Sequence, residues 1–135
     1  MTLLQDICTF LSSKDIVQGD GIDVFRDFSP EKPDDVVVLY EYKGDPSSPF
    51  DTIVHRSVQV TARSNNPERA REKATAIYKA LYSDTNFVQF TAKRWAQVYL
   101  RQTPYKLYTD ENGRAVYGFN IGVTTEIKQE DKNGY

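Results

Sequence analysis

The sequence predicts an α+β fold in which two helices pack on one face of an antiparallel, at most mixed, sheet of four to five strands. Apolar residues alternate with polar ones in residues 54–62 and again in residues 115–127, whereas residues 70–81 place them at helical spacing. Side chains alternate between faces in a strand and return to one face every three to four residues in a helix. The 135-residue chain fits a single domain, residues 1–135. Such a domain buries roughly two-thirds of the surface that the unfolded chain exposes.

Residues 2–12 predict the first helix, because Thr2 and Gln5 have the spacing of a capping box. Its apolar stripe consists of Leu3, Leu4, Ile7, Phe10 and Leu11. Cys8 lies on the same side of the helix. As the single cysteine it has no partner for an intramolecular disulfide, and a buried apolar role is favoured over a nucleophile.

An acidic segment, residues 15–35, follows the helix and contains at most a short strand around residues 22–25. Residues 36–43 then predict a strand, and its unbroken start, Val-Val-Val-Leu, favours burial on both faces. Residues 44–51 predict a loop that is longer than a tight hairpin needs. Such a loop is either an interaction arm or an idle stretch of surface.

A strand over residues 52–63 runs into a helix over residues 67–82. Asn66 provides a helix cap, and Pro67 suits the first helical position, where no backbone N–H is needed. The strand directs Val54, Val58, Val60 and Ala62 to one face, and the helix aligns Ala70, Ala74, Ile77, Tyr78 and Leu81. Both elements therefore have an apolar surface for a common core.

Two further strands are predicted at residues 86–90 and 94–103, and the chain then forms a long hairpin. Asn112-Gly113 favours a two-residue type I′ turn, because both central residues of that turn need positive φ. Pro104 cannot donate a ladder hydrogen bond. The strand before the turn therefore lies at a sheet edge or is bulged at Pro104.

The strand after the turn has two different faces. Its core-facing residues are Ala115, Tyr117, Phe119, Ile121, Val123, Thr125 and Ile127. The residues between them, which are mostly small or polar, are Val116, Gly118, Asn120, Gly122, Thr124 and Glu126. This second set predicts a face open to water or to another subunit. Residues 128–135 predict a polar tail.

Residue patterns for catalysis or metal binding are missing from the sequence. His55 is the single histidine and has no second histidine or cysteine at metal-ligand spacing, so a surface or hydrogen-bonded role is favoured. The acid pairs Asp34-Asp35 and Asp110-Glu111 fall in predicted loops, where solvated turn residues are favoured over a catalytic or Ca²⁺ role. We therefore expect no enzyme activity and no cofactor.

Neither a membrane span nor a signal peptide is predicted. No stretch approaches the roughly 20 apolar residues that cross a bilayer, and the N-terminus lacks a basic start followed by an apolar run. These observations favour synthesis and action in a cytosol, without a membrane partner.

Charge is unevenly distributed along the chain, although its net charge is only −2. Residues 1–51 hold eleven acids and four bases, a net −7, while residues 52–125 hold five acids and eleven bases, a net +6. Two interpretations remain open. The blocks lie on different surfaces and favour head-to-tail association of subunits, or they neutralise each other within one subunit.

Basic and aromatic residues are interleaved in the C-terminal half. The bases are Lys93, Arg94, Arg101, Lys106 and Arg114, and the aromatic residues are Trp95, Tyr99, Tyr105, Tyr108 and Tyr117. Such a stretch can stack bases and track phosphates. A protein interface is favoured over nucleic acid, because the acidic net charge repels DNA and because tyrosine and arginine are enriched at interfaces.

Four features together resemble the minor capsid and tail terminator proteins of long-tailed bacteriophages, which join tail to head. They are the short N-terminal helix, Pro33-Asp34 before a strand, the strand and helix spanning residues 56–81, and the turn at residues 110–114 before an aromatic strand. The resemblance spans most of the chain.

This resemblance implies a non-enzymatic virion component of the phage neck or upper tail, assembled in the host cytoplasm. Members of that family form hexameric rings that stop polymerisation of the tail tube and offer a joining surface to the head. The implied partners are further copies of the chain, the tail tube protein and a head-completion or stopper protein, with DNA only passing through the ring. Candidate contact residues are Arg94, Arg101, Lys106, Arg114, Asp45 and Asp51. Alternatives are a head-completion or stopper (minor capsid) protein, then a small nucleic-acid-binding module, and last a small enzyme.

Overall fold

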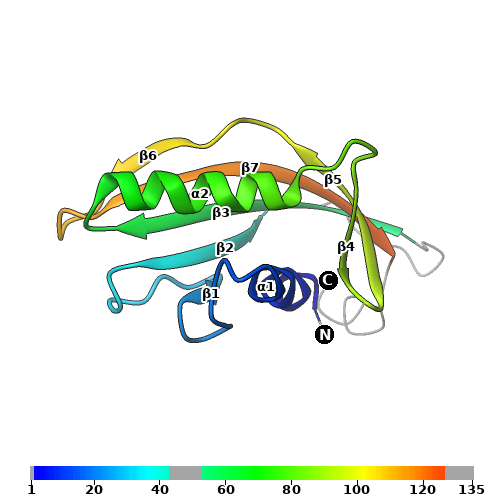
Figure 1. The fold of residues 1–135 in the computed structure, drawn as a ribbon, viewed down its shortest axis with the longest axis horizontal. Helices are drawn as coiled ribbons and strands as arrows, with labels where there is room; N and C mark the ends of the chain where they lie inside the picture. Colours follow the sequence, from blue (N-terminus) through cyan, green and yellow to red (C-terminus); the bar gives the residue numbers. More distant parts are fainter. Residues whose placement is uncertain (1, 43–52, 127–135) are drawn as a thin grey trace.

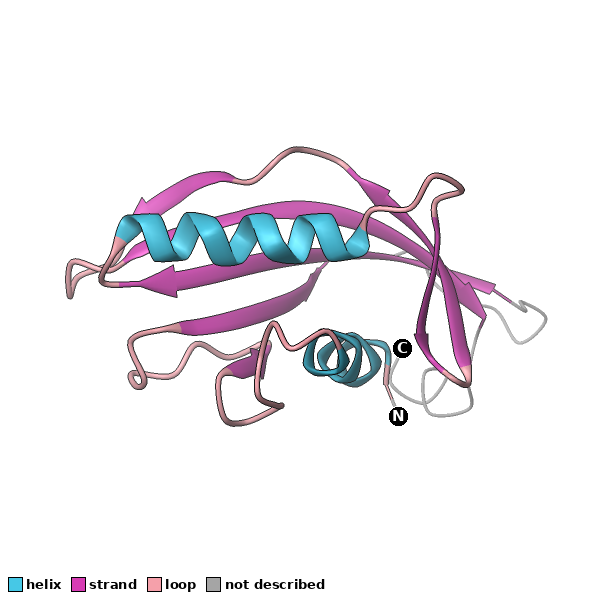
Figure 2. Cartoon of the chain, viewed as in Figure 1, coloured by secondary structure: helices cyan, strands magenta, loops and turns pink. Residues whose placement is uncertain are grey.

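The computed structural model describes residues 2–42 and 53–126, which form two helices and one curled sheet of seven strands (Figures 1 and 2). The elements in chain order are α1 (Leu3–Ser13), β1 (Val24–Arg26), β2 (Val36–Tyr42), β3 (Ile53–Ser64), α2 (Pro67–Leu81), β4 (Phe87–Thr91), β5 (Arg94–Leu100), β6 (Tyr105–Thr109) and β7 (Ala115–Glu126). Across the sheet the order is β1-β2-β3-β7-β5-β4, and β6 also pairs with β7. The predicted α+β class is confirmed.

The predicted number of four to five strands is wrong. One extra strand is the three-residue β1, which runs parallel to β2 and makes the sheet mixed. Another arises because β5 and β6 lie end to end along the same side of β7, with Leu100 opposite Ile121 and Tyr105 opposite Gly118. The interruption between them contains Pro104, and β6 pairs with β7 alone, so the edge position is confirmed rather than a bulge at Pro104.

Both helices begin as the sequence predicts. Thr2 caps α1 in a complete capping box with Gln5, and Asn66 caps α2 by accepting a hydrogen bond from the N–H of Glu68 at 3.0 Å. The helices differ in position, because α2 lies along the central strands β3 and β7 whereas α1 contacts β4 and β1 near the sheet edges (Figure 1).

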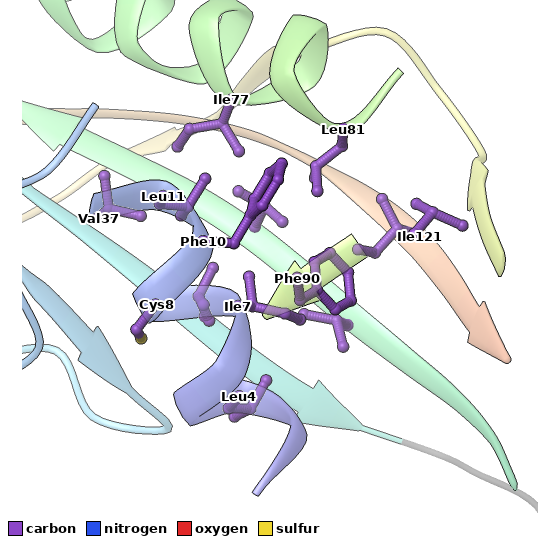
Figure 3. Close-up of a cluster of buried hydrophobic side chains, with 14 of the residues drawn as sticks. Leu4, Ile7, Cys8, Phe10, Leu11, Val37, Ile77, Leu81, Phe90 and Ile121 are labelled. Carbon is purple, nitrogen blue, oxygen red and sulfur yellow. The ribbon is translucent and has the colours of Figure 1, made fainter. Parts of the chain in front are cut away.

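One apolar core joins both helices to the inner face of the curled sheet. Phe10 and Leu11 of α1 approach Ile77 and Leu81 of α2, with Phe90 of β4 beside them (Figure 3). The central strands provide the floor of this core, where Val58 pairs with Ile121 and Val60 with Phe119. The predicted core-facing residues of β3 and β7 are buried as far as the described residues reach, except that Tyr117 is half-buried. The predicted open face of β7 is wrong at its start, because Val116 is 3% exposed. The strand start at residues 36–39 is buried.

The hairpin between β6 and β7 differs from the predicted type I′ turn. Gly113 has φ +77°, but Asn112 is not among the residues with positive φ. Instead, Asp110 and Arg114 close a three-residue loop, and the N–H of Gly113 donates to the carbonyl of Asp110 at 3.0 Å. A type I turn followed by a left-handed glycine forms this loop. The Asp110 side chain accepts from the N–H groups of Asn112 and Arg114, which favours the longer loop.

Candidate assembly surface

The outer face of the sheet points away from the helices and the core. Its centre consists of three cross-strand pairs between β3 and β7: His55 with Thr124, Ser57 with Gly122, and Gln59 with Asn120. Their neighbours along each strand point into the core, because successive side chains alternate between faces. Among the described residues, no helix lies over this face (Figure 1). The centre of the outer face is therefore flat and polar.

Large aromatic side chains flank this polar centre. Phe87 on β4 and Trp95 and Tyr99 on β5 are 52%, 58% and 45% exposed. Tyr105 and Tyr108 on β6 pair with Gly118 and Val116, and both are also exposed. Contiguous exposed apolar surface on a small protein commonly marks a contact site, and aromatic residues dominate the energetics of protein interfaces.

Arg101 lies across the centre of the outer face. A Cβ atom on Gly122 would stand 2.8 Å from its Nη2, so the guanidinium lies directly over that glycine. The backbone N–H of Arg101 donates to the carbonyl of Asn120 at 3.0 Å, and its Nη2 is 3.5 Å from the hydroxyl oxygen of Ser57. The glycine thus gives the cation room beside the aromatic residues.

The other predicted contact residues fall into three groups. Lys106 is exposed on β6 but pairs with Tyr117, so it lies on the opposite side of that strand from Tyr105. A contact role for Arg101 and Lys106 stays a prediction. Asp45 and Asp51 lie outside the described residues. Arg94 and Arg114 are buried within the subunit.

Arg94 forms an internal ion pair that the sequence did not predict. Its Nε donates to the carboxylate of Asp6 on α1, and the side chains are 0% and 7% exposed. Its Nη1 lies 3.4 Å from the hydroxyl of Thr125. These contacts tie α1 to β5 and leave no exposed guanidinium for a partner to bind. Ala96, two residues after Arg94, and Ile7, next to Asp6, are also buried.

Arg114 has a comparable role at the hairpin end of the sheet. Its Nε donates to Asp110 at 2.8 Å, and its Nη1 contacts Asp34 at 3.3 Å and the carbonyl of Glu31 at 2.6 Å. Burial alone would raise the pKa of Asp110, but hydrogen bonds donated by Arg114 and Asn112 hold that pKa below its ordinary value. Asp110 thus binds an arginine and is largely covered, whereas the sequence favoured a solvated turn residue. Asp34 also contacts Arg114, but its side chain stays 53% exposed, in keeping with that prediction.

Arg63 was also missed as a structural residue. Its Nη2 donates to the carbonyl of Pro33 at 2.7 Å, and its Nη1 donates to Ser29 at 3.0 Å. Together with Arg114 it fastens the segment before β2 to the sheet. The sequence indicated only that Arg63 lies on the polar face of the strand, not that it binds the segment before β2.

The structure resolves part of the question about charge. Ion pairs join the acidic and basic blocks within the subunit at Arg94–Asp6, Arg69–Asp35 and Arg114–Asp34. These pairs support neutralisation within one subunit for the groups they contain. The cations Lys93, Arg101 and Lys106 remain exposed, as does Asp27.

The side chains that could act as a catalytic base, a nucleophile or metal ligands are not arranged for such a role in the described residues. His55 is exposed, and its Nδ1 is 2.7 Å from the hydroxyl oxygen of Thr124, as expected for a hydrogen-bonded surface histidine. Burial raises the pKa of the Cys8 thiol to about 12, which opposes formation of a thiolate. Across residues 2–42 and 53–126, no cluster of histidine, cysteine and acidic side chains could hold a metal ion. In the same ranges, neither helix is long and apolar enough to cross a membrane.

The fold and this surface define a small α+β structural subunit with one packed face and one exposed aromatic face. A family model described as bacteriophage tail terminator protein matches residues 9–127. The chain therefore belongs to the bacteriophage tail terminator family and is a structural protein of the phage tail and a virion component. A search of curated proteins finds no match. The resemblance noted in the sequence is confirmed.

Proposed function

We propose that this protein is a tail terminator that closes the end of the tail tube as an oligomeric ring, expected to be a hexamer, and joins the tail to the head. The observation that carries the proposal is the family match over residues 9–127. The outer face supports it, because Phe87, Trp95 and Tyr99 are exposed in the single subunit. Contacts with further copies or with tail proteins would cover such residues.

The proposed partners are further copies of the chain, the tail tube protein and a head-completion or stopper protein. DNA passes through the ring without being held by it. The site of action is the phage neck or upper tail, with assembly in the host cytoplasm. A stopper protein is the runner-up, and the family match favours the terminator over it.

Nucleic-acid binding is disfavoured by the position of the bases. Two of the five residues that suggested it, Arg94 and Arg114, are buried in ion pairs with carboxylates. If the remaining cations bound phosphates, log affinity for duplex DNA would fall by about 0.9 per unit of log salt for each phosphate neutralised. We expect no retention of DNA at physiological salt.

Polymerisation of the tail tube protein tests the proposal. The tube protein is allowed to polymerise with and without the purified protein, and electron microscopy measures the tube lengths and images the ends. We expect short tubes capped by rings with a central hole. Tubes of unchanged length with bare ends would contradict the proposed function.

A further inference from the structure

Two exposed patches lie near opposite ends of the strand order. The acidic patch, beside β1, comprises Asp20, Ile22, Asp27 and Phe28. The basic patch, on β4, β5 and the residues just after them, comprises Phe87, Lys93, Trp95, Tyr99 and Arg101. The strand order places β1 and β4 at opposite ends of the sheet, and α1 contacts both strands and lies between them (Figure 1).

The acidic patch is built around two apolar side chains. Ile22 is 57% and Phe28 61% exposed, although both are large apolar residues that normally avoid water. Local contacts fix the backbone here: the N–H of Asp27 donates to the carbonyl of Leu39 at 2.8 Å, and its carboxylate accepts from the N–H of Glu41 at 2.9 Å. Phe28 packs edge to face against Phe25.

The segment that carries these apolar side chains is acidic. Residues 15–28 contain four acids, Asp15, Asp20, Asp23 and Asp27, and one base, Arg26. Arg26 pairs with Asp20 at 3.0 Å, which leaves the patch net negative. Two exposed apolar side chains, one before and one after β1 in a net negative segment, fit a partner that is aromatic and positively charged.

The basic patch offers that complementary chemistry. Residues 85–109 contain no acid at all, Arg94 is paired to Asp6, and Lys93 and Arg101 are exposed. Trp95 and Tyr99 present exposed aromatic surface on β5, and Arg101 lies over Gly122, the residue that pairs with Tyr99. Tryptophan, tyrosine and arginine are the residue types that most often supply the binding energy of an interface.

We propose that the acidic patch of one copy docks on the basic patch of the next copy, head to tail. This inference rests on the proposed ring and names the surfaces that build it. A contact between two different patches of the same chain is heterologous, so each copy keeps one patch for each neighbour, and repetition closes a ring when the rotation allows it. A second copy of the chain is the proposed partner of each patch, because the two patches have opposite charge and both expose apolar side chains.

A mixing experiment tests the proposal. Ile22→Arg damages the acidic patch and Trp95→Glu damages the basic patch, while Tyr82→Arg alters an equally exposed residue outside both patches and serves as the matched control. Native mass spectrometry measures the assemblies of each variant alone and of an equal mixture. Circular dichroism melts establish that each variant is folded, and Phe28→Arg with Tyr99→Glu is a second pair if one of the first does not fold.

We expect rings from the parent and from Tyr82→Arg, and monomers from Ile22→Arg or Trp95→Glu alone. The mixture should give one-to-one heterodimers without rings, because each variant retains one intact patch for the other. Rings from either single variant, or monomers in the mixture, would overturn the head-to-tail contact and leave the ring itself standing. Absence of rings from the parent and on tail tubes would overturn the proposed function instead.

Discussion

β7 serves two different surfaces within one strand. Toward the helices it presents Phe119, Ile121 and Val123, which are at most 1% exposed and belong to the core. At intervening positions on the opposite face it presents Asn120 and Gly122, small or polar residues. The inner face fills space with apolar volume, whereas the outer face stays flat enough for Arg101 to lie on it. The comparison teaches that inner-face residues hold the subunit together, whereas the outer-face residues at these positions add little to the core.

Two arginines of β5 and its end also differ between the inner and outer faces. Arg94 is enclosed on the inner side with Asp6, and Arg101 is exposed on the outer side above Gly122. Both belong to the same basic stretch of sequence, and their odd spacing of seven residues puts them on opposite faces of a strand. Changing each face in turn should therefore affect different properties, stability for the inner face and self-association for the outer face.

Removing Asp6 should have the largest effect on stability. Asp6→Ala leaves the buried guanidinium of Arg94 without its carboxylate, and such a loss costs about 3–5 kcal/mol. Denaturant unfolding followed by circular dichroism measures the change. The double variant Asp6→Ala/Arg94→Met is the control and should recover part of the loss, since no buried charge remains. If Asp6→Ala unfolds like the parent, the pair does not stabilise the subunit.

Truncating Leu81 should cost somewhat less. Its side chain lies in the core between α2 and the sheet (Figure 3), so Leu81→Ala should lower the free energy of unfolding by about 2–5 kcal/mol. Lys79 is exposed on the same helix, and Lys79→Ala should stay within about 0.5 kcal/mol. Urea melts of both variants compare them. A collapse of Lys79→Ala together with a parent-like Leu81→Ala would reverse the assignment of the two helix faces.

Acidification should lower the stability of the hairpin end of the sheet, with a smaller effect than the two substitutions above. The pKa of Asp110 is held below its ordinary value of 3.8 in the folded protein, so its contribution is complete above that value and is lost as the pH falls through the lower, folded pKa. Stability measured between pH 5 and pH 2 should decline over this range. Asp110→Asn removes the titrating group and should flatten part of that decline. An equal decline in both proteins would exclude Asp110 as a source of the acid sensitivity.

Local patterns predicted most of the helices and strands, because caps and periodicity act over a few residues. Thr2 and Asn66 marked the two helix starts, and the alternation in residues 115–125 separated the inner and outer faces of β7. The turn at Asn112 was mistaken because the carboxylate of Asp110, two residues earlier, favours a different loop.

The burial of Arg94 and Arg114 could not be predicted from local pattern. The partner of Arg94, Asp6, is 88 residues away in the chain, so only the fold brings these charges together. Arg114 has a local partner in Asp110, four residues before it, but its contact with Asp34 spans 80 residues. Charged residues are rarely buried unless paired, and a single sequence does not reveal the pair. The sequence allowed a short strand around residues 22–25, which overlaps β1, but it did not indicate the parallel pairing of β1 with β2.

The most direct test of the division between the faces measures stability and assembly on one variant. Trp95→Ser/Tyr99→Ser removes two exposed aromatic residues from the outer face and none from the core. Unfolding is measured in dilute, monomeric solution, so that assembly does not alter the apparent stability. Mass photometry of concentrated samples measures the rings. We predict that each substitution changes the free energy of unfolding by no more than about 0.5 kcal/mol and that the rings are lost. Rings of parental mass, or a large loss of stability in the monomer, would contradict the account.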